Sequence, residues 1–253
     1  MGVPTLGCGC TVCTSADPRD RRLRPSAALR WTEPETGTER VVVIDTGPDF
    51  REQILRSGIH RVDAILYTHA HADHILGMDD LRPFSFKAFR ESGGPIPLYA
   101  APDTADVLKR IFDYTFSPDT TYPNRARVKL EPLGESNSVQ GVEFVRIPVL
   151  HGEMKISGFR FGNAAYLTDV SAIPEPSFAL LDGLDQLVLS ALRHKPHPTH
   201  ATVEQAAAWA RRIGARHTWL IHIAHDLGHE ETNRALPPSA QLAYDGLSVP
   251  VVL

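Results

Sequence analysis

Three histidines and one aspartate lie within six positions of one short segment. The histidines are His69, His71 and His74, and the aspartate is Asp73. The segment follows an apolar run, residues 63–67, that predicts a buried strand. Side chains two apart on an extended chain point the same way, and the last two residues then turn towards a second point. Imidazole nitrogens and a carboxylate are ligands of zinc, manganese and iron. We therefore predict a metal site here rather than a solvated, histidine-rich loop.

The same motif is characteristic of the metallo-β-lactamase superfamily, which this chain resembles. The resemblance implies two metals. His69, His71 and a distant histidine would bind one metal, and Asp73, His74 and another distant histidine would bind the second. An aspartate would bridge the two metals. The distant ligands are each expected to follow a strand.

Three residues stand in the order along the chain that this resemblance requires. His151 follows the strand-like run 142–150 and resembles the third ligand of the first metal. Asp169 follows residues 164–168 and resembles the bridging carboxylate. His222 follows residues 217–221 and resembles the last ligand. Either histidine taken alone would more often be a surface or capping residue, but their shared position after a strand favours the ligand role.

All three cysteines, Cys8, Cys10 and Cys13, fall within six residues. An odd number of cysteines with no preceding secretory signal does not favour disulfides. Three thiolates at this spacing predict instead a structural zinc site that lacks one ligand. His225, three residues after His222, is the candidate for the fourth, although buried or free thiols remain the alternative. This pairing of motifs resembles the phosphoribosyl 1,2-cyclic phosphate phosphodiesterases of the carbon–phosphorus lyase pathway.

A histidine-rich segment precedes the helix predicted over residues 202–212. Thr202 or Thr199 is placed to cap that helix. The cyclic phosphodiesterases and the tRNA 3′-processing endonucleases of the superfamily carry a histidine at such a position, where it acts on the phosphate or leaving oxygen. His200 matches that residue, and we predict that it is catalytic together with Asp73. His194 and His197 have weaker claims and are expected to line the pocket or face water.

Composition limits the classes of function. The chain has 253 residues and a net charge of 26 minus 30, or −4, so no overall basic field attracts nucleic acid. No apolar run approaches the roughly 20 residues of a membrane span. Three unpaired-looking cysteines and many metal-type histidines suggest a reducing, cytoplasmic setting. The length suits one domain, and we predict that residues 1–253 form a single metallo-β-lactamase-type domain.

The predicted fold class is mixed α/β (α+β), arranged as an αββα sandwich. Residues 41–44 predict a buried strand that ends at Asp45. Asp45 is expected either to orient metal ligands or to cap a helix over residues 49–56. A further helix is predicted over residues 102–112. Other strands are expected near Val128, Val142, Phe159, Ala165, Leu187, Trp219 and Val249.

Two further expectations concern the N-terminal part. Relatives usually begin with a strand before the segment that matches residues 2–4, whereas this sequence starts at that segment, so we expect one of two situations. The true start lies upstream, or the first strand of the sheet is absent. In the second case a neighbouring strand would be left as an exposed sheet edge. The charged residues 17–24 predict a solvated loop.

The expected chemistry is hydrolysis by a water that two metals activate, with zinc or manganese, and also iron, as candidates. His200 would protonate or stabilise the leaving alkoxide. Arg82 and Lys87, which follow the metal motif, are candidates for binding an anionic substrate, although solvation of these charges is an even alternative.

The leading functional hypothesis is a phosphodiesterase that acts on small, cyclic phosphodiesters. A tRNA 3′-processing endonuclease and a thioester or lactam hydrolase are the alternatives. The lysine-rich arm expected of the endonuclease is not evident. A non-enzymatic metal-binding role is the least favoured. We expect a small-molecule phosphodiester as substrate, no membrane or nucleic-acid partner, and, from the relatives alone, a homodimer.

Overall fold

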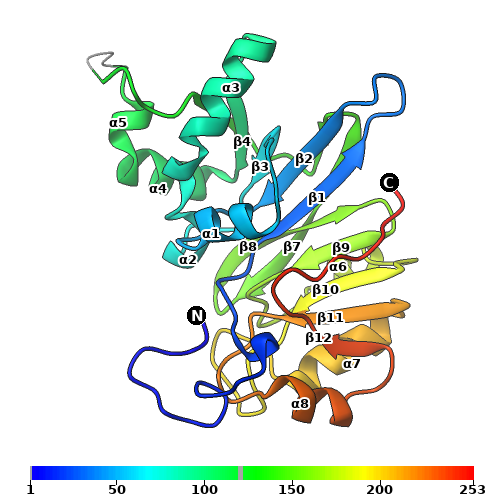
Figure 1. Cartoon of the computed structure of the whole chain (residues 1–253). Coiled ribbons are helices and arrows are strands. Elements are labelled where there is room, and N and C mark those ends of the chain that lie inside the picture. The colour runs from blue at the N-terminus through cyan, green and yellow to red at the C-terminus, as the bar shows by residue number, and fades with distance from the viewer. Residues whose placement is uncertain (1, 119–121) are drawn as a thin grey trace. The chain divides into compact units, whose positions relative to one another are not determined.

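The computed structural model describes residues 2–118 and 122–253, which divide into two compact units. The first unit comprises residues 1–23, 135–138 and 142–253, and the second comprises residues 24–134 and 139–141. Each unit contains one β-sheet (Figure 1). The single domain predicted from the sequence stays a prediction. Among the described residues, every helix is too short or too polar to cross a bilayer.

The second unit is built on a five-stranded sheet in the order β1-β2-β3-β4-β5. Strands β2 to β5 are parallel, and β1 pairs antiparallel with β2 at the sheet edge. Its core contains Val43, Ile65 and Leu98 from the sheet and Phe50 and Leu108 from helices. Its elements are β1 (Ala27–Thr32), β2 (Glu39–Ile44), α1 (Phe50–Arg56), β3 (Ala64–Leu66), α2 (Ala72–Ile75), η2 (Met78–Leu81), α3 (Arg82–Ser92), β4 (Ile96–Ala100), α4 (Pro102–Ile111), α5 (Asp113–Phe116) and β5 (Val128–Pro132).

The first unit is built on a seven-stranded sheet in the order β12-β11-β10-β9-β8-β7-β6. Strands β9 to β12 are parallel, whereas β8 is antiparallel to both β7 and β9. Strand β7 therefore runs in the same direction as β9, β10 and β11. The elements are η1 (Pro18–Asp20), β6 (Ser136–Val139), β7 (Val142–His151), β8 (Met154–Phe161), β9 (Ala164–Leu167), α6 (Glu175–Ala179), β10 (Gln186–Ser190), α7 (Val203–Ile213), β11 (His217–Ile221), α8 (His229–Ala235) and β12 (Ala240–Leu242).

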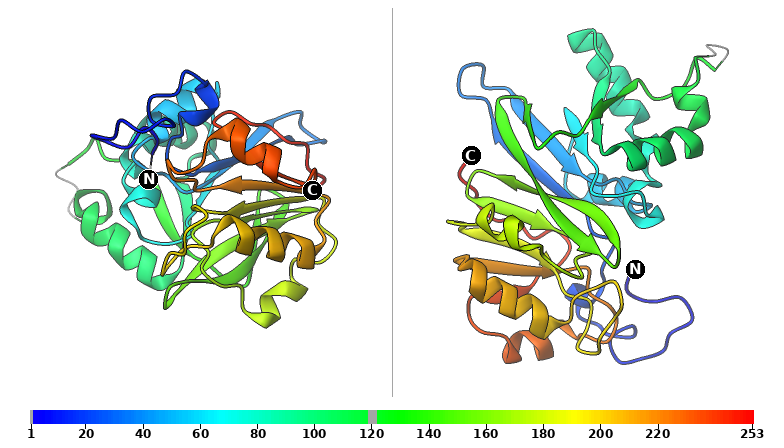
Figure 2. Two further views of the ribbon diagram at one scale, coloured as in Figure 1. Left: turned by 90° about the horizontal axis from the view of Figure 1, so that it is seen from below. Right: turned by 180° about the vertical axis from the view of Figure 1, so that it is seen from behind.

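Helices α6 and α7 cover one face of this sheet (Figure 2, right). Helix α7 contributes Val203, Ala206 and Ala210 to the core of the first unit. It begins at Thr202, whose hydroxyl accepts from the backbone N–H of Gln205 while the Gln205 side chain accepts from the Thr202 N–H. This capping box fixes the start of the helix, and therefore the end of the preceding loop that carries His200.

Most predicted elements are present, but the strand expected near Val249 is wrong. The last strand is β12, which pairs with β11, and residue 249 lies in the non-regular tail that follows it. Pro250 has no N–H to donate to a sheet ladder, which disfavours a strand there. The tail is held instead by Asn163, whose backbone N–H donates to the Val252 carbonyl at 3.0 Å.

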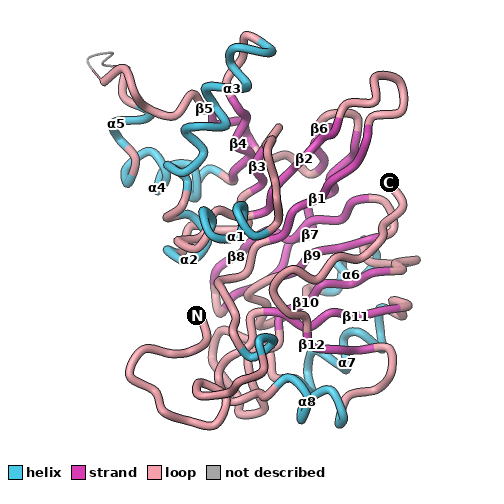
Figure 3. The backbone as a smooth tube through the Cα atoms, in the orientation of Figure 1, coloured by secondary structure: helices cyan, strands magenta, loops and turns pink. Residues whose placement is uncertain are grey.

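The solvated loop predicted for residues 17–24 is also wrong. The segment is mostly non-helical backbone, as Figure 3 shows, but Asp20 and Arg22 are buried within it. The Arg22 guanidinium pairs with Asp20 at 3.1 Å and donates to the carbonyls of Ala224 and Leu227. The Asp20 carboxylate also accepts from the His229 N–H. The charges are therefore used to join the N-terminal segment to residues 224–229.

This buried pair predicts a large effect on stability. Replacing Arg22 by Ala leaves the Asp20 carboxylate buried without its cation and removes two further hydrogen bonds. We expect the free energy of unfolding to fall by about 3–5 kcal/mol. Urea denaturation measures it. Arg30→Ala is the control, because Arg30 pairs with Glu39 on the surface, where a loss of about 0–1 kcal/mol is expected. Equal losses in the two variants would contradict the role given to Arg22.

Candidate metal centre

The predicted ligands divide between the two units, and in each unit they lie at the carboxyl edge of the sheet. In the second unit, Asp45 follows β2 and His69 follows β3, which are parallel neighbours. In the first unit, His151 ends β7, Asp169 follows β9 and His222 follows β11. Because these three strands run in one direction, their carboxyl ends meet at the same edge, which is where α/β proteins place their sites.

The histidines of the sequence motif cluster within the second unit. The ring of His69 lies 4.6 Å from that of His71 and 4.2 Å from that of His74. Helix α2 starts immediately after His71 and carries the other two motif residues, so that His74 Nε2 lies 3.9 Å from a carboxylate oxygen of Asp73. Three imidazoles and a carboxylate at these separations are a suitable donor set for divalent metals.

Asp45 is fully buried and orients two of these histidines. Its carboxylate accepts from the Thr68 N–H at 2.8 Å, the Thr68 hydroxyl at 2.7 Å and His74 Nδ1 at 2.7 Å. Because the single Thr68 hydroxyl hydrogen goes to Asp45, His69 Nδ1 donates to that hydroxyl at 3.0 Å. Both rings therefore carry the proton on Nδ1 and the lone pair on Nε2. Burial raises the pKa of Asp45, while the hydrogen bonds from His74 and Thr68 oppose that shift.

The turn after β2 packs directly on the backbone of the motif. A Cβ on Gly47 would lie 2.2 Å from the carbonyl oxygen of Asp73, and one on Gly77 would lie 2.1 Å from the carbonyl oxygen of Gly47. The Thr46 N–H donates to the His74 carbonyl at 2.8 Å. Only glycine permits this approach, so these two positions fix where α2 lies. No local sequence signal predicts this role for either glycine.

In the first unit, Asp169 places one carboxylate oxygen towards each of two histidines. Its Oδ1 lies 3.4 Å from His222 Nε2, and its Oδ2 lies 4.0 Å from His151 Nε2. The Thr168 hydroxyl donates to Oδ1 at 2.7 Å and so holds the carboxylate plane. His151 Nδ1 donates to the Thr199 carbonyl at 2.6 Å, which leaves the lone pair of His151 on Nε2. This arrangement suits the bridging role predicted for Asp169.

Three of these residues have a left-handed backbone. Asp45, Asp169 and His222 have φ values of 63°, 56° and 55°, and in the described residues the only other non-glycine residue with positive φ is Gln140. This conformation costs free energy for residues with a Cβ and is concentrated at functional sites. Each of the three stands where a strand ends and the chain turns sharply, a feature that sequence periodicity does not reveal.

His200 lies against the ligands of the first unit. Its ring stacks on His222 at 4.7 Å and 19° and lies 4.6 Å from the ring of His151. Its Nδ1 is buried and accepts or donates no hydrogen bond among the described residues. Burial and the neighbouring His222 lower the pKa of His200 to about 3. The resting ring is therefore neutral, which favours stabilisation of a leaving oxygen by a hydrogen bond over the imidazolium form.

The other two histidines of this loop differ from each other. His194 is exposed and pairs with Glu204 at 2.6 Å. The ring of His197 lies 4.9 Å from that of His200, and burial lowers its pKa.

The three cysteines surround one nitrogen of His225. The sulfurs of Cys8, Cys10 and Cys13 lie 3.2, 3.4 and 3.5 Å from His225 Nδ1. A single ring nitrogen cannot hydrogen-bond to three sulfurs at once. Zinc bonds of about 2.3 Å to sulfur and about 2.0 Å to nitrogen, at a tetrahedral angle, separate the two ligand atoms by about 3.5 Å. The four residues therefore fit a tetrahedral zinc.

One of these thiols is acidic. A backbone hydrogen bond at Cys13 is the main cause that lowers the pKa of Cys10 to about 6, so its thiolate prevails at neutral pH.

The two basic residues proposed for substrate binding make local contacts. Arg82 forms an ion pair with Asp79, and the exposed Lys87 donates to the His60 carbonyl at 3.4 Å. These contacts favour the alternative in which the two charges serve the local structure and face water.

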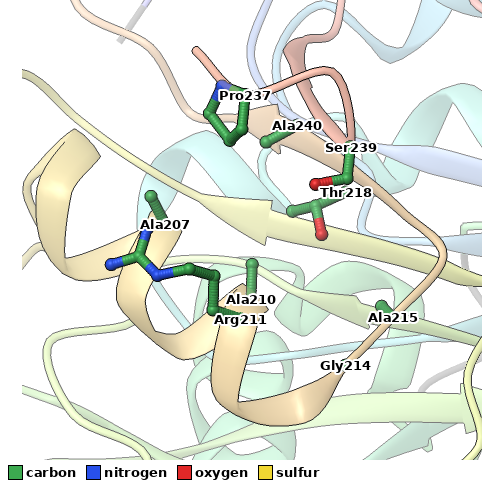
Figure 4. Close-up of a pocket in the computed structure, with 9 residues that line it drawn as sticks. All are labelled: Ala207, Ala210, Arg211, Gly214, Ala215, Thr218, Pro237, Ser239 and Ala240. Carbon is green, nitrogen blue, oxygen red and sulfur yellow. The ribbon is translucent and has the colours of Figure 1, made fainter.

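A cavity of about 220 Å³ in the first unit lies at the opposite edge of the sheet (Figure 4). It is lined by α7, by the start of β11 and by residues that follow α8. Small side chains such as Ala207 and Ala210 dominate the lining, and the predicted ligands are not part of it. We assign this cavity no part in the chemistry.

Comparisons with known proteins show the family to which this chain is similar. The family described as "Beta-lactamase superfamily domain" matches residues 40–223. A crystal structure of a diphosphatase from the PhnP family is 52% identical, with a TM-score of 0.90, and the match covers 100% of this chain and 94% of that one. Zinc-bound PqqB from Methylobacterium extorquens is 21% identical with a TM-score of 0.73, over 99% of this chain and 96% of that one.

A third relative is longer than this chain. An octanoyltransferase from Porphyromonas gingivalis is 35% identical over 250 residues, which are 97% of this chain but 48% of that protein. The chain thus spans about half the length of this relative. The matches confirm the predicted fold class: mixed α/β with two sheets, of the metallo-β-lactamase type.

The Asp45 network predicts an effect on metal affinity. Asp45→Asn removes the charged acceptor of His74 and weakens the Thr68 bridge to His69. We expect metal affinity to fall by about 10–100-fold, as for other residues that orient metal-binding histidines. Competition with a chromophoric chelator measures it. Asp49→Asn is the control, because Asp49 lies four residues away and pairs with Arg24 instead. Wild-type affinity in the Asp45 variant would exclude the orienting role.

Proposed function

Because this chain belongs to the beta-lactamase superfamily and, within it, to the PhnP family, we propose that it is a metal-dependent hydrolase of small phosphodiesters. The place of His200 carries the phosphate assignment. Its neutral ring stacks on the candidate ligand His222, and its buried Nδ1 lacks a hydrogen-bond partner among the described residues. A phosphate or leaving oxygen beside the ligands would supply that partner.

We propose that the seven ligands predicted from the sequence bind a pair of divalent metals, as the family resemblance implies. The donors are His69, His71, Asp73, His74, His151, Asp169 and His222. An all-histidine and carboxylate set accepts zinc, manganese or iron. Metals held in this way lower the pKa of water and offset negative charge on phosphoryl oxygens.

The protein residues have separate tasks in this proposal. Asp45 keeps the lone pairs of His69 and His74 on Nε2, and the Thr199 carbonyl does the same for His151. Asp169 directs one carboxylate oxygen towards His151 and the other towards His222, which suits a carboxylate shared by two cations. His200 donates a hydrogen bond to the leaving oxygen as negative charge develops there.

Cys8, Cys10, Cys13 and His225 are proposed to hold a structural zinc. This site would join the N-terminal segment to the loop after β11, where the buried Arg22 and Asp20 pair already does so.

The proposal predicts three metal ions per chain. We expect elemental analysis of protein purified without added metal to find one zinc and two further divalent ions. Cys10→Ser should lose one zinc and keep the other pair, because the thiolate is replaced by a weaker ligand. The control is Ser15→Ala, a change in the same segment that leaves the four ligands intact. An unchanged zinc content in the Cys10 variant would rule out this cluster as a zinc site.

The role of His200 predicts a loss of turnover without a loss of metal. His200→Ala should lower kcat by about 10²–10⁴-fold, the usual contribution of such a group. Metal content should equal that of the wild type. His217→Ala, which changes an exposed histidine at the start of β11, is the control. Since the nitrogens of His200 lie close to ligand atoms of Asp169 and His222, loss of a metal ion would instead make it a ligand.

A second candidate function is hydrolysis of diphosphates, which the 52% identical diphosphatase favours. Assays on bis-p-nitrophenyl phosphate, 2′,3′-cyclic nucleotides, a diphosphate and a thioester distinguish the classes. We expect hydrolysis of one or more of the phosphate compounds and little hydrolysis of the thioester. Activity on the thioester alone would overturn the proposed function.

A further inference from the structure

The loop of residues 193–200, which joins β10 to α7, is held firmly at its base. The Leu192 N–H donates to the Ala201 carbonyl at 2.9 Å, and the Val203 N–H donates to the Arg193 carbonyl at 3.1 Å. The Ala201 N–H in turn donates to the Val170 carbonyl at 2.7 Å, next to Asp169. The loop is therefore fixed against the strand ends that carry the candidate ligands of the first unit.

This loop concentrates basic groups in a chain whose net charge is −4. Residues 191–203 contain no Asp or Glu. His194 is exposed and pairs with Glu204 at 2.6 Å. The other basic residues of the loop are Arg193, Lys195 and His197, and the ring of His197 lies 4.9 Å from that of His200.

Arg193 serves the backbone of the loop. Its guanidinium donates to the carbonyls of Lys195 at 3.3 Å and Pro196 at 3.4 Å. These bonds close the loop on itself, and the Lys195 residue is exposed.

His197 is a fixed hydrogen-bond donor next to His200. It stands between Pro196 and Pro198, and a residue before proline is restricted to extended backbone. The Thr199 N–H donates to His197 Nδ1 at 3.3 Å, and an N–H can only donate, so Nδ1 is the acceptor. The proton of the neutral ring therefore lies on Nε2. With its ring 4.9 Å from that of His200, His197 offers this N–H close to the proposed reacting phosphate.

We propose that His197 and Lys195 bind the second phosphoryl group of a diphosphate substrate. This inference rests on the proposed function and narrows its substrate class. A simple phosphodiester has one phosphoryl group, which the metals and His200 would engage. In a diphosphate, a second charged phosphoryl group follows after one bridging oxygen and needs its own donors. A neutral imidazole N–H and a lysine ammonium supply a hydrogen bond and a compensating charge.

Two substrates with the same adenosine group test this inference. ADP-ribose carries a diphosphate, and 2′,3′-cyclic AMP carries a single cyclic phosphodiester. For Lys195→Ala and His197→Ala we expect kcat/KM for ADP-ribose to fall by about tenfold or more, mainly through KM. The value for 2′,3′-cyclic AMP should change less than about twofold. His197→Asn keeps an N–H donor and should retain part of the ADP-ribose activity.

Two control variants change exposed residues outside this loop. Lys129→Ala and His217→Ala change an exposed lysine and an exposed histidine elsewhere and should leave both substrates unaffected. Equal losses on the two substrates would show that His197 only supports His200, and unchanged kinetics would remove the subsite. Either result overturns the inference.

A binding measurement separates this inference from the proposed function. Metal-loaded protein, freed of excess metal, is titrated calorimetrically with inorganic pyrophosphate and with inorganic phosphate. We expect wild-type protein to prefer pyrophosphate, and the Lys195 and His197 variants to lose most of that preference. If the wild type hydrolyses neither adenosine compound but shows this pattern, the proposed function fails and the subsite stands. An undiminished preference in the variants would exclude the subsite.

Discussion

The rest of the site in the second unit depends on the hydrogen bonds that the buried carboxylate of Asp45 accepts. This carboxylate is fully enclosed, and three donors converge on it: the backbone and hydroxyl of Thr68 and the ring of His74. Through the Thr68 hydroxyl it also reaches His69. One charge therefore sets the protonation and direction of two imidazoles on separate elements. A buried carboxylate is tolerated because hydrogen bonds replace the water that it has lost.

In the first unit, the positions of the candidate ligands are determined by where the strands end. Strands β7, β9 and β11 run in one direction, so His151, Asp169 and His222 meet at one edge. The loop before α7 reaches the same edge and adds His200. The N-terminal segment is joined to residues 224–229 through Arg22 and Asp20, and Cys8, Cys10 and Cys13 gather around His225. The position of the loop that starts at His222 thus depends on contacts with a segment about 200 residues earlier.

Much of this arrangement could be predicted from the sequence because it follows local rules. An apolar run followed by His69 or Asp169 predicts a strand that ends at a polar residue, and Thr202 with Gln205 predicts the start of a helix. The types of the candidate site residues and their order along the chain could therefore be predicted. The strand expected near Val249 is absent because an apolar run alone does not supply a pairing partner, and Pro250 lacks the N–H that a sheet ladder needs.

Other features depend on tertiary contacts, and no local signal reveals them. Residues 17–24 are rich in charge, yet Asp20 and Arg22 are buried because they satisfy backbone groups from a distant segment. The close approach of Gly47 and Gly77 depends on how a turn packs on α2. The distinction between His194, which pairs with Glu204, and His197, which faces His200, depends on the conformation of one loop. The spacing in the sequence predicts that the three histidines lie in one loop, but it does not predict the direction in which each ring points.

The left-handed backbone at Asp45, Asp169 and His222 has a consequence for how this protein can change. Each such residue costs about 1–3 kcal/mol relative to a relaxed conformation. Glycine would adopt these dihedral angles without that cost, but it has no side chain to bind or orient a cation. Glycine at Asp45 would relieve the backbone but would also leave the donors of Thr68 and His74 without their buried acceptor, so the strained conformation is retained together with the side chain that needs it.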